Sequence, residues 1–196
     1  GLGSLSSAVL NNQACIFGDA AVAGLSIAMK IYNIMRSALL GVGQGFQPVA
    51  GYNYGAGKKD RVKKALAFTI VLGMSFCLVI AIIIGLNAET IMKLFRSDDP
   101  EAIAIGAKTL MFMTFSLPIL GYPTFVNQLY QCVGFSVRAT FLASCRQGLF
   151  FIPFCIIASR YIGLTGLMAT QAVSDTLFAL ISIPFHIYFY KKYLNN

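Results

Sequence analysis

The feature that most constrains this chain is a series of long apolar runs that contain no charged residue. Ala65 to Leu86 is 22 residues long without a charge, and Thr109 to Val137 is also free of charge. A helix needs about 20 apolar residues to cross the hydrocarbon core of a bilayer. Charged residues make up 11% of the chain and hydrophobic residues 57%, whereas soluble domains are roughly 25% charged. This balance argues against a soluble enzyme, a disordered chain or a disulfide-stapled secreted module.

These runs predict an all-α integral membrane protein in which residues 1–196 form a single transmembrane lobe. Membrane β-strands would be alternating segments of roughly ten residues, and the runs here are about twice as long without alternation. Asp19 is expected to cap the second helix. Asp98 to Glu101 predicts another helix start, with an Asp cap, Pro at the first helical position and an acid in the first turn. The expected spans are residues 1–17, 20–49, 65–86, 107–134, 140–160 and 164–190, with an interfacial helix at 88–96.

The chain begins at Gly1 inside an apolar segment and without a Met. Nothing near this end resembles a charged region followed by an apolar core and a cleavage site, as a signal peptide would. We therefore expect the first helix to be truncated and the chain to be a C-terminal fragment of a longer protein.

The basic residues are unevenly distributed between the two ends of the predicted spans. Nine lie on one side, where we interpret Arg138 and Arg146 as bracketing a short turn, and four lie on the other. Cytoplasmic loops are enriched in Lys and Arg, so the prediction is a multi-pass protein of the cell (plasma or inner) membrane with a cytoplasmic C-terminus. The net charge of +8 does not predict nucleic-acid binding, because no basic patch is interleaved with aromatic residues. The nine are Lys58, Lys59, Arg61, Lys63, Lys64, Arg138, Arg146, Lys191 and Lys192.

Polar side chains recur at helical spacing along the predicted span 20–49, so they share one face of a helix. Lys30 lies about 16 Å of helix from Asp19. This places it near the middle of the bilayer, where an ammonium group needs water or an anionic partner. A water-filled pathway is the favoured interpretation, and a dry helix–helix seam with Lys30 paired to a carboxylate is the alternative. The stripe consists of Ser26, Lys30, Asn33, Ser37, Gly41, Gln44 and, with some drift, Gln47.

Further candidates for a pathway come from other predicted spans. Two are amides one turn apart near the end of span 107–134, and two are adjacent amides in the first segment. Asp175 is the only acid well inside a full span. It is either a functional partner of a cation such as Lys30 or a half-exposed residue near the outer boundary. The predicted substrate or ion pathway comprises Asn11, Asn12, Ser26, Lys30, Asn33, Ser37, Gln44, Asn127, Gln131 and Asp175.

The sequence contains none of the common catalytic motifs. There is no GxSxG, HExxH or Walker sequence, and there is a single His. The five cysteines are odd in number, lie mostly in apolar runs and form neither a CxxC motif nor a zinc spacing with His. We therefore predict no enzyme activity and no cofactor, and a metal site can be assigned to no particular residues.

Four stretches resemble one transporter family. GVGQGFQPVAGYNYGAGKKDRVKKAL (Gly41 to Leu66), with its GYNYGA segment and basic run, resembles the loop that leaves the eighth helix of multidrug and toxic compound extrusion (MATE) transporters. NQLYQCVG (127–134) resembles the end of helix ten, and SCRQGLFFIP (144–153) the start of helix eleven. GLTGLMATQAVSDTL (163–177) resembles the beginning of helix twelve. The resemblance covers the whole chain as a C-terminal lobe, from the middle of helix seven through helix twelve.

This resemblance implies an exporter of twelve helices in two six-helix lobes. Such transporters exchange cytosolic cationic or amphipathic compounds for Na⁺ or H⁺ by alternating access, and the missing N-terminal lobe is the implied partner. Helices seven, eight and ten line the family's cavity, and these are the spans that carry polar stripes here. Some branches carry two Glu for a Na⁺ site on helix seven, where this chain has Asn11 and Asn12. Whether Na⁺ or H⁺ is the coupling ion is therefore left open.

Two other functions remain as alternatives. A transporter of the same broad fold that moves lipid-linked oligosaccharide or polysaccharide would have a groove rich in cationic side chains, and Lys30 and Arg36 keep this alternative open. A non-transporting membrane scaffold would bury the polar stripes in dry seams. The aqueous accessibility of cysteines substituted at Asn33 and Gln131 separates a pathway from a seam.

Overall fold

The computed structural model describes residues 2–96 and 98–194, and every regular element in these residues is a helix. The predicted all-α class is confirmed. α6, η1 and α7 follow one another without a break, so residues 136–161 form one long helix with a π-helical middle. The elements are α1 (Leu2–Cys15), α2 (Asp19–Gly55), α3 (Lys59–Leu86), α4 (Ala88–Phe95), α5 (Pro100–Cys132), α6 (Ser136–Ser144), η1 (Cys145–Phe151), α7 (Ile152–Tyr161), α8 (Leu164–Phe189) and η2 (Tyr190–Leu194).

Several helices are longer than the sequence predicts. α2 continues to Gly55, and the chain turns only at Ala56 to Lys58, where Gly57 has a φ of +71°. α3 begins at Lys59, so the basic segment 59–64, which precedes the predicted span, forms the first part of the helix. α5 begins at Pro100, and the predicted cap is confirmed by a 3.0 Å bond from the Ala102 amide to Asp99 Oδ1. The other predicted cap is wrong by one residue, since Gly18 precedes α2 at a φ of 96° and Asp19 lies in the first turn.

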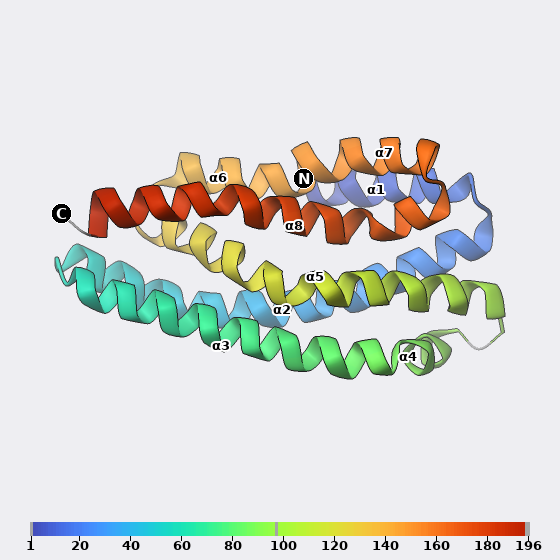
Figure 1. Cartoon of the computed structure of the whole chain (residues 1–196), viewed down its shortest axis with the longest axis horizontal. Helices are drawn as coiled ribbons and strands as arrows, with labels where there is room; N and C mark the ends of the chain where they lie inside the picture. The colour runs from blue at the N-terminus through green and yellow to red at the C-terminus, as the bar shows by residue number, and fades with distance from the viewer. Residues whose placement is uncertain (1, 97, 195–196) are drawn as a thin grey trace.

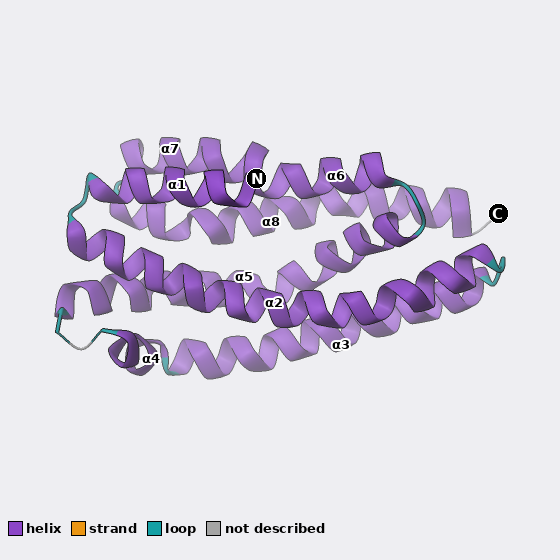
Figure 2. Cartoon of the chain, turned by 180° about the vertical axis from the view of Figure 1, so that it is seen from behind, coloured by secondary structure: helices purple, strands orange, loops and turns teal. Residues whose placement is uncertain are grey.

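The helices form two layers that α5 connects (Figure 1). α1, α6, α7 and α8 make one layer, and α2 and α3 make the other, with α4 at its end. α5 begins in the second layer, packs on α2, α3 and α8, and approaches the first layer toward its C-terminal end (Figure 2). Pro118 and Pro123 interrupt the backbone hydrogen bonds of α5 near its middle.

Two apolar clusters hold the layers together. The larger cluster joins α2, α3, α5 and α8, and Leu39, Leu117 and Phe125 are fully buried in it. The smaller cluster lies between α1, α2 and α7, with Leu25 and Cys155 at its centre. These clusters fix the relative positions of the helices that carry the polar stripes.

The outer surface of α3 is apolar along most of its length. Phe68, Val71 and Ile83 are more than half exposed, as are several of their neighbours. Four helices of the described chain are long and apolar enough to cross a membrane: Lys59–Leu86, Pro100–Cys132, Ser136–Tyr161 and Leu164–Leu194. α2 is also long enough, and we expect it to cross as well, but its polar stripe lowers its hydropathy. The exposed apolar surface is the side that would face lipid.

α4 is the helix predicted to lie at the interface. Ala88 and Met92 are buried against the bundle, while Phe95 is exposed. Lys93 Nζ lies 2.7 Å from Glu89 Oε1, and this hydrogen bond lowers the pKa of the Glu89 carboxyl. The charged pair faces away from the buried side of the helix, which is the arrangement of an amphipathic helix.

The predicted turn between Arg138 and Arg146 is wrong. The chain turns earlier, at Gly134, which has a φ of 89°, and the interval from Ala139 to Cys145 is helical. That interval contains neither Gly nor Pro, so nothing in it breaks the helix. Arg146 is therefore buried within the helix 136–161, and it drops out of the nine basic residues that the sequence predicts on one side of the membrane.

Candidate functional site

A network of charged and polar side chains is buried around Asp175 of α8. Arg146 Nε lies 2.8 Å from Asp175 Oδ1, and Gln171 Nε2 lies 2.9 Å from the same oxygen. Tyr32 donates its hydroxyl proton to Oδ2, and Ser116 Oγ lies 3.4 Å from that oxygen. The carboxylate thus receives hydrogen bonds from α2, α5, η1 and its own helix.

Arg146 completes the network with a second contact. Its Nη2 lies 3.3 Å from the Tyr32 hydroxyl, so the guanidinium bridges α8 and α2. Arg146 also lies in η1, the π-helical segment, and π-bulges occur frequently at functional sites. A buried ion pair offsets its desolvation only when further hydrogen bonds satisfy both groups, and the Asp175 carboxylate meets this condition.

The structure corrects two expectations about Asp175. It is completely buried, so a half-exposed position near the outer boundary is excluded. Its cationic partner is Arg146 and not Lys30, which is exposed and forms no ion pair with a described residue. The pairing could not be anticipated, since Arg146 was assigned to a turn.

Three adjoining cavities form a polar groove between the two layers. Their volumes are about 350, 310 and 190 Å³. Arg36, Arg146 and Gln147 line both the first and the second cavity, and Asn33 lines both the second and the third. We call this set of three cavities the groove. We call the position of Arg36, Arg146 and Gln147, where the first and second cavities meet, the waist of the groove. α2 lines all three cavities, α1 lines the second and third, η1 lines the first and second, and α5 lines the first.

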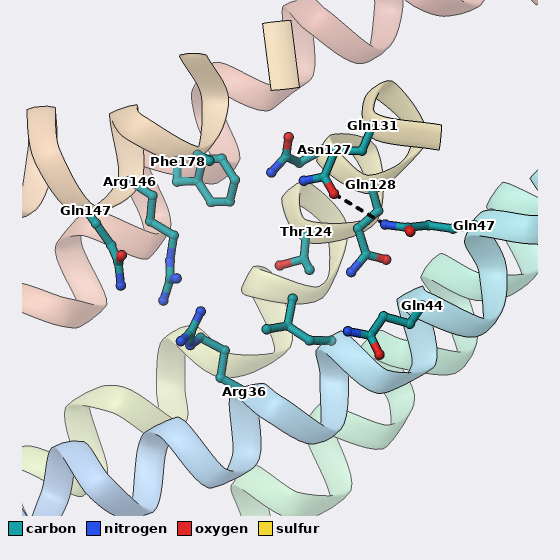
Figure 3. Close-up of a pocket in the computed structure, with 12 residues that line it drawn as sticks. Arg36, Gln44, Gln47, Thr124, Asn127, Gln128, Gln131, Arg146, Gln147 and Phe178 are labelled. Atoms are coloured by element: carbon teal, nitrogen blue, oxygen red, sulfur yellow. Dashed lines mark hydrogen bonds between the residues drawn. The ribbon is translucent and has the colours of Figure 1, made fainter. Parts of the chain in front are cut away.

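The first cavity is lined by amides (Figure 3). Gln47 Nε2 lies 3.3 Å from Gln131 Oε1, which joins α2 to α5 across the cavity. The side-chain oxygens of Asn127 and Gln128 are buried and have no hydrogen-bond partner among the described residues. Buried polar atoms are nearly always bonded to protein or water, but the Gln128 oxygen packs against Gly43 of α2 and is not open to the cavity.

The third cavity lies between α1 and α2. Ser26 Oγ donates to Asn11 Oδ1 at 3.3 Å, and Lys30 and Asn33 line the cavity beside them. Lys30, Asn33 and Asn11 are all exposed. Most of the polar stripe of α2 therefore faces the groove: Ser26, Lys30 and Asn33 line the third cavity, and Gln44 lines the first.

Seven of the ten predicted pathway residues line the groove, and three do not. Asp175 lies behind Arg146, and Ser37 bonds the backbone oxygen of Asn33 at 2.8 Å. Asn12 is exposed and lines none of the three cavities. Arg146, Gln147 and Gln128 also line the first cavity, and none of them is among the predicted pathway residues, although the SCRQ and NQLYQ segments contain them. The seven are Asn11, Ser26, Lys30, Asn33, Gln44, Asn127 and Gln131.

The groove is basic. Lys30, Arg36 and Arg146 line it, none of the described acidic residues does, and the adjacent Asp175 is bound by Arg146. In the described part of the chain, no group of three or more His, Cys, Asp and Glu side chains lies close enough together to hold a metal ion. The groove can thus offer ligands a guanidinium, an ammonium and several amides.

A bundle of membrane-length helices that carries a polar groove and a buried ion pair belongs to the class of polytopic membrane transporters. The family model MatE matches residues 2–157, and the chain belongs to this family. The chain is 24% identical over 178 residues to the multidrug export protein MepA of Staphylococcus haemolyticus, and 28% identical over 181 residues to that of Staphylococcus saprophyticus. Each match covers 89% of this chain and 38% of the relative, so the chain spans well under half the length of these relatives.

Solved structures share the fold. A mutant of the Vibrio cholerae MATE transporter VcmN aligns with a TM-score of 0.89 at 21% identity, over 98% of this chain and 44% of that one. A MOP superfamily transporter from Pyrococcus furiosus, described as having a binding pocket of reverse polarity that suggests a different function, aligns with a TM-score of 0.87 at 19% identity, over 96% of this chain and 44% of that one. At these identities the likeness concerns the fold, and it confirms a MATE-type helical lobe.

Proposed function

We propose that this chain is the C-terminal lobe of a secondary active multidrug exporter, which exchanges cationic or amphipathic compounds for Na⁺ or H⁺ by alternating access. The partner is an N-terminal six-helix lobe of the same protein. The complete transporter resides in the cell membrane with the C-terminus of this lobe in the cytoplasm, because Lys58 to Lys64, Lys191 and Lys192 gather at one end of the bundle.

The observation that carries this proposal is the groove. A scaffold gains nothing from polar side chains that face open space, since polar groups at membrane depth are costly unless they serve a pathway. Asn33 and Gln44 of α2 are exposed toward the groove, and Asn127 and Gln131 of α5 line it. The names of the relatives, multidrug export proteins, agree with a pathway for organic compounds.

A cationic substrate finds no free carboxylate in this groove. Asp175 is the acid nearest to it, and Arg146 already neutralises that carboxylate. We therefore place the counter-charge for a cation, and the principal coupling acid, in the N-terminal lobe. The amides of this lobe would contribute hydrogen bonds and shape to the shared cavity.

Transport by the full-length protein in proteoliposomes tests the proposal. Efflux of a fluorescent cationic dye is followed first under an imposed Na⁺ gradient and then under an imposed H⁺ gradient. Movement driven by either ion supports the exporter and identifies the coupling ion. A matched variant, Gln44→Leu, removes one amide from the groove and should slow transport, whereas Thr176→Ala, on the exposed face of α8, should not.

A second candidate is favoured by the basic lining. A transporter of the same fold that moves lipid-linked oligosaccharide must hold a phosphate, and Lys30 and Arg36 supply cationic groups to the groove. Absence of gradient-driven dye movement in folded protein, together with flipping of a lipid-linked sugar in the same vesicles, would replace the exporter with this candidate.

A further inference from the structure

Arg36 has the most unusual environment of the charged residues in the groove. Its side chain extends from α2 into the waist, where it lines both the first and the second cavity. It is half-buried, and its Nε atom is buried without a hydrogen-bond acceptor. Among the described residues it has no carboxylate partner. A guanidinium held in a partly desolvated position without an acceptor is costly unless a ligand or water supplies one.

The neighbours of Arg36 increase the positive potential at this point. Arg146 approaches from η1 on the opposite side of the first cavity (Figure 3). One edge of the Arg146 guanidinium is occupied, because Nε binds Asp175 and Nη2 lies 3.3 Å from the Tyr32 hydroxyl. Arg36 is thus the guanidinium of the two that has no hydrogen-bond or ion-pair partner in the part of the chain that the structure describes.

We propose that the waist of the groove is an oxyanion subsite, in which Arg36 binds the carboxylate or phosphate group of an amphipathic ligand. The inference rests on the proposed function, since it names the chemistry of one part of the substrate for the same groove. Arg36 is the binding residue of this subsite, and Arg146, which is held by Asp175, adds positive charge beside it.

The chemistry of the waist suits an oxyanion. A guanidinium presents its donors in a planar fork that matches the two oxygens of a carboxylate or phosphate. The Gln147 amide lies at the waist and can donate a further bond, whereas the Thr124 hydroxyl already donates to the Leu120 backbone oxygen. Leu40 and Phe178 line the same cavity and provide an apolar wall for the body of the ligand. A small basic cavity with both kinds of surface selects an amphipathic anion or zwitterion over a simple cation.

Binding of two matched dyes tests the subsite. One is a rhodamine with a free carboxylate, and the other is the methyl ester of the same dye, so that they differ only in the oxyanion. Their affinities for the purified full-length protein are measured by fluorescence polarisation. We expect the carboxylate dye to bind about tenfold more tightly than the ester, since a charge-assisted pair of hydrogen bonds is lost in the ester.

Variants assign the preference to Arg36. Arg36→Gln should abolish the preference for the carboxylate dye without weakening the binding of the ester, and Arg36→Lys should retain part of the preference. Arg160→Gln, a matched loss of charge at the exposed end of α7, should bind both dyes as the wild type does. Equal affinity of the wild type for the two dyes, or equal loss of both in Arg36→Gln, would overturn the proposal.

A competition that needs no variant guards against a folding defect. Benzoate should displace the carboxylate dye from the wild type, and benzamide, its uncharged analogue, should not. Displacement by neither compound, or equally by both, would also overturn the subsite. If the dyes are discriminated but no gradient moves them, the proposed export function fails while the subsite stands.

The source of the oxyanion is identified by lipid composition. In vesicles that contain phosphatidylglycerol, a lipid phosphate bound at Arg36 would weaken binding of the carboxylate dye relative to phosphatidylcholine vesicles, and Arg36→Gln would remove the difference. Equal binding in both lipids, with the preference between the dyes intact, assigns the subsite to the transported compound. A preference that persists in Arg36→Gln in both lipids would count against the subsite.

Discussion

Arg146 Nε and Asp175 Oδ1 lie 2.8 Å apart, and both side chains are buried. The pair joins the long helix 136–161 to α8; Asp175 is fully buried, and Arg146 is 8% exposed at the edge of the groove. Removing one member leaves the other as an isolated buried charge, which is far more costly than the pair is stabilising. The two residues therefore depend on each other, and this dependence can be measured.

Replacing the acid alone should destabilise the lobe strongly. Asp175→Asn is expected to lower the free energy of unfolding by about 3–5 kcal/mol, because Arg146 loses its counter-charge in a buried position. Denaturant unfolding of the full-length protein in detergent, followed by helical circular dichroism, measures this loss. Asp19→Asn, at the exposed start of α2, should cost less than about 1 kcal/mol. Losses of equal size would contradict a special role for the pair.

Replacing both members should recover most of that loss. Arg146→Met combined with Asp175→Leu removes both charges and fills the space with apolar groups, and such exchanges are often neutral or stabilising by about 1–4 kcal/mol. The same unfolding measurement completes a double-mutant cycle. A double variant that is less stable than Asp175→Asn would show that the hydrogen bonds of Tyr32 and Gln171 to the carboxylate matter more than its charge.

Arg36 should behave in the opposite way from Arg146. It has no ion-pair partner among the described residues and its Nε atom lacks an acceptor, so Arg36→Gln leaves no opposite charge stranded. We expect the free energy of unfolding to change by less than about 1 kcal/mol, or to rise slightly, because a partly desolvated charge is removed. A loss comparable to that of Asp175→Asn would reveal a structural partner for Arg36.

The sequence predicted the fold well because its strongest signals are local. Long apolar runs fix the helices, and the cap at Asp99 with Pro100 after it fixes the start of α5. The stripe on α2 was predicted by its spacing, since one helix face is set by the period of the helix alone. The family resemblance added the lobe organisation, and the MatE match confirms the family.

The candidate site was only partly predictable, since partners from different helices leave no spacing in the sequence. Nothing near Asp175 indicates that Arg146, 29 positions earlier, is its partner. Two arginines eight residues apart looked like the ends of a turn, whereas only one of them lies near the end of a helix. Absence of Gly and Pro between them was the one available signal, and it favoured a continuous helix.

The close packing of α2 on α5 gives a prediction about glycine. A Cβ at Gly24 would lie 2.6 Å from the Ala102 backbone oxygen and 3.0 Å from the Gly106 amide, and a backbone cannot move aside as a side chain can. Gly24→Ala should therefore destabilise the lobe by about 1–3 kcal/mol. Gly45→Ala, on the same helix with no atom within 4 Å, should be neutral or gain up to about 1 kcal/mol from helix propensity. Equal effects at the two positions, measured by unfolding, would contradict this packing.

Cysteine accessibility decides whether the groove contains water. In a Cys15→Ser background, which removes the exposed native thiol, Asn33→Cys and Gln131→Cys of the full-length protein should react with a charged, membrane-impermeant thiol reagent. Thiols react as thiolates, which form readily in water and poorly in hydrocarbon. Two controls bracket the result: Ser174→Cys is fully buried, and Val79→Cys is 57% exposed on the apolar face of α3, so neither should react. Reaction at the groove positions alone supports a hydrated pathway, because exposure to lipid cannot produce it. If Asn33→Cys and Gln131→Cys are as inert as Val79→Cys, the polar stripes form a dry seam and the chain belongs to a scaffold.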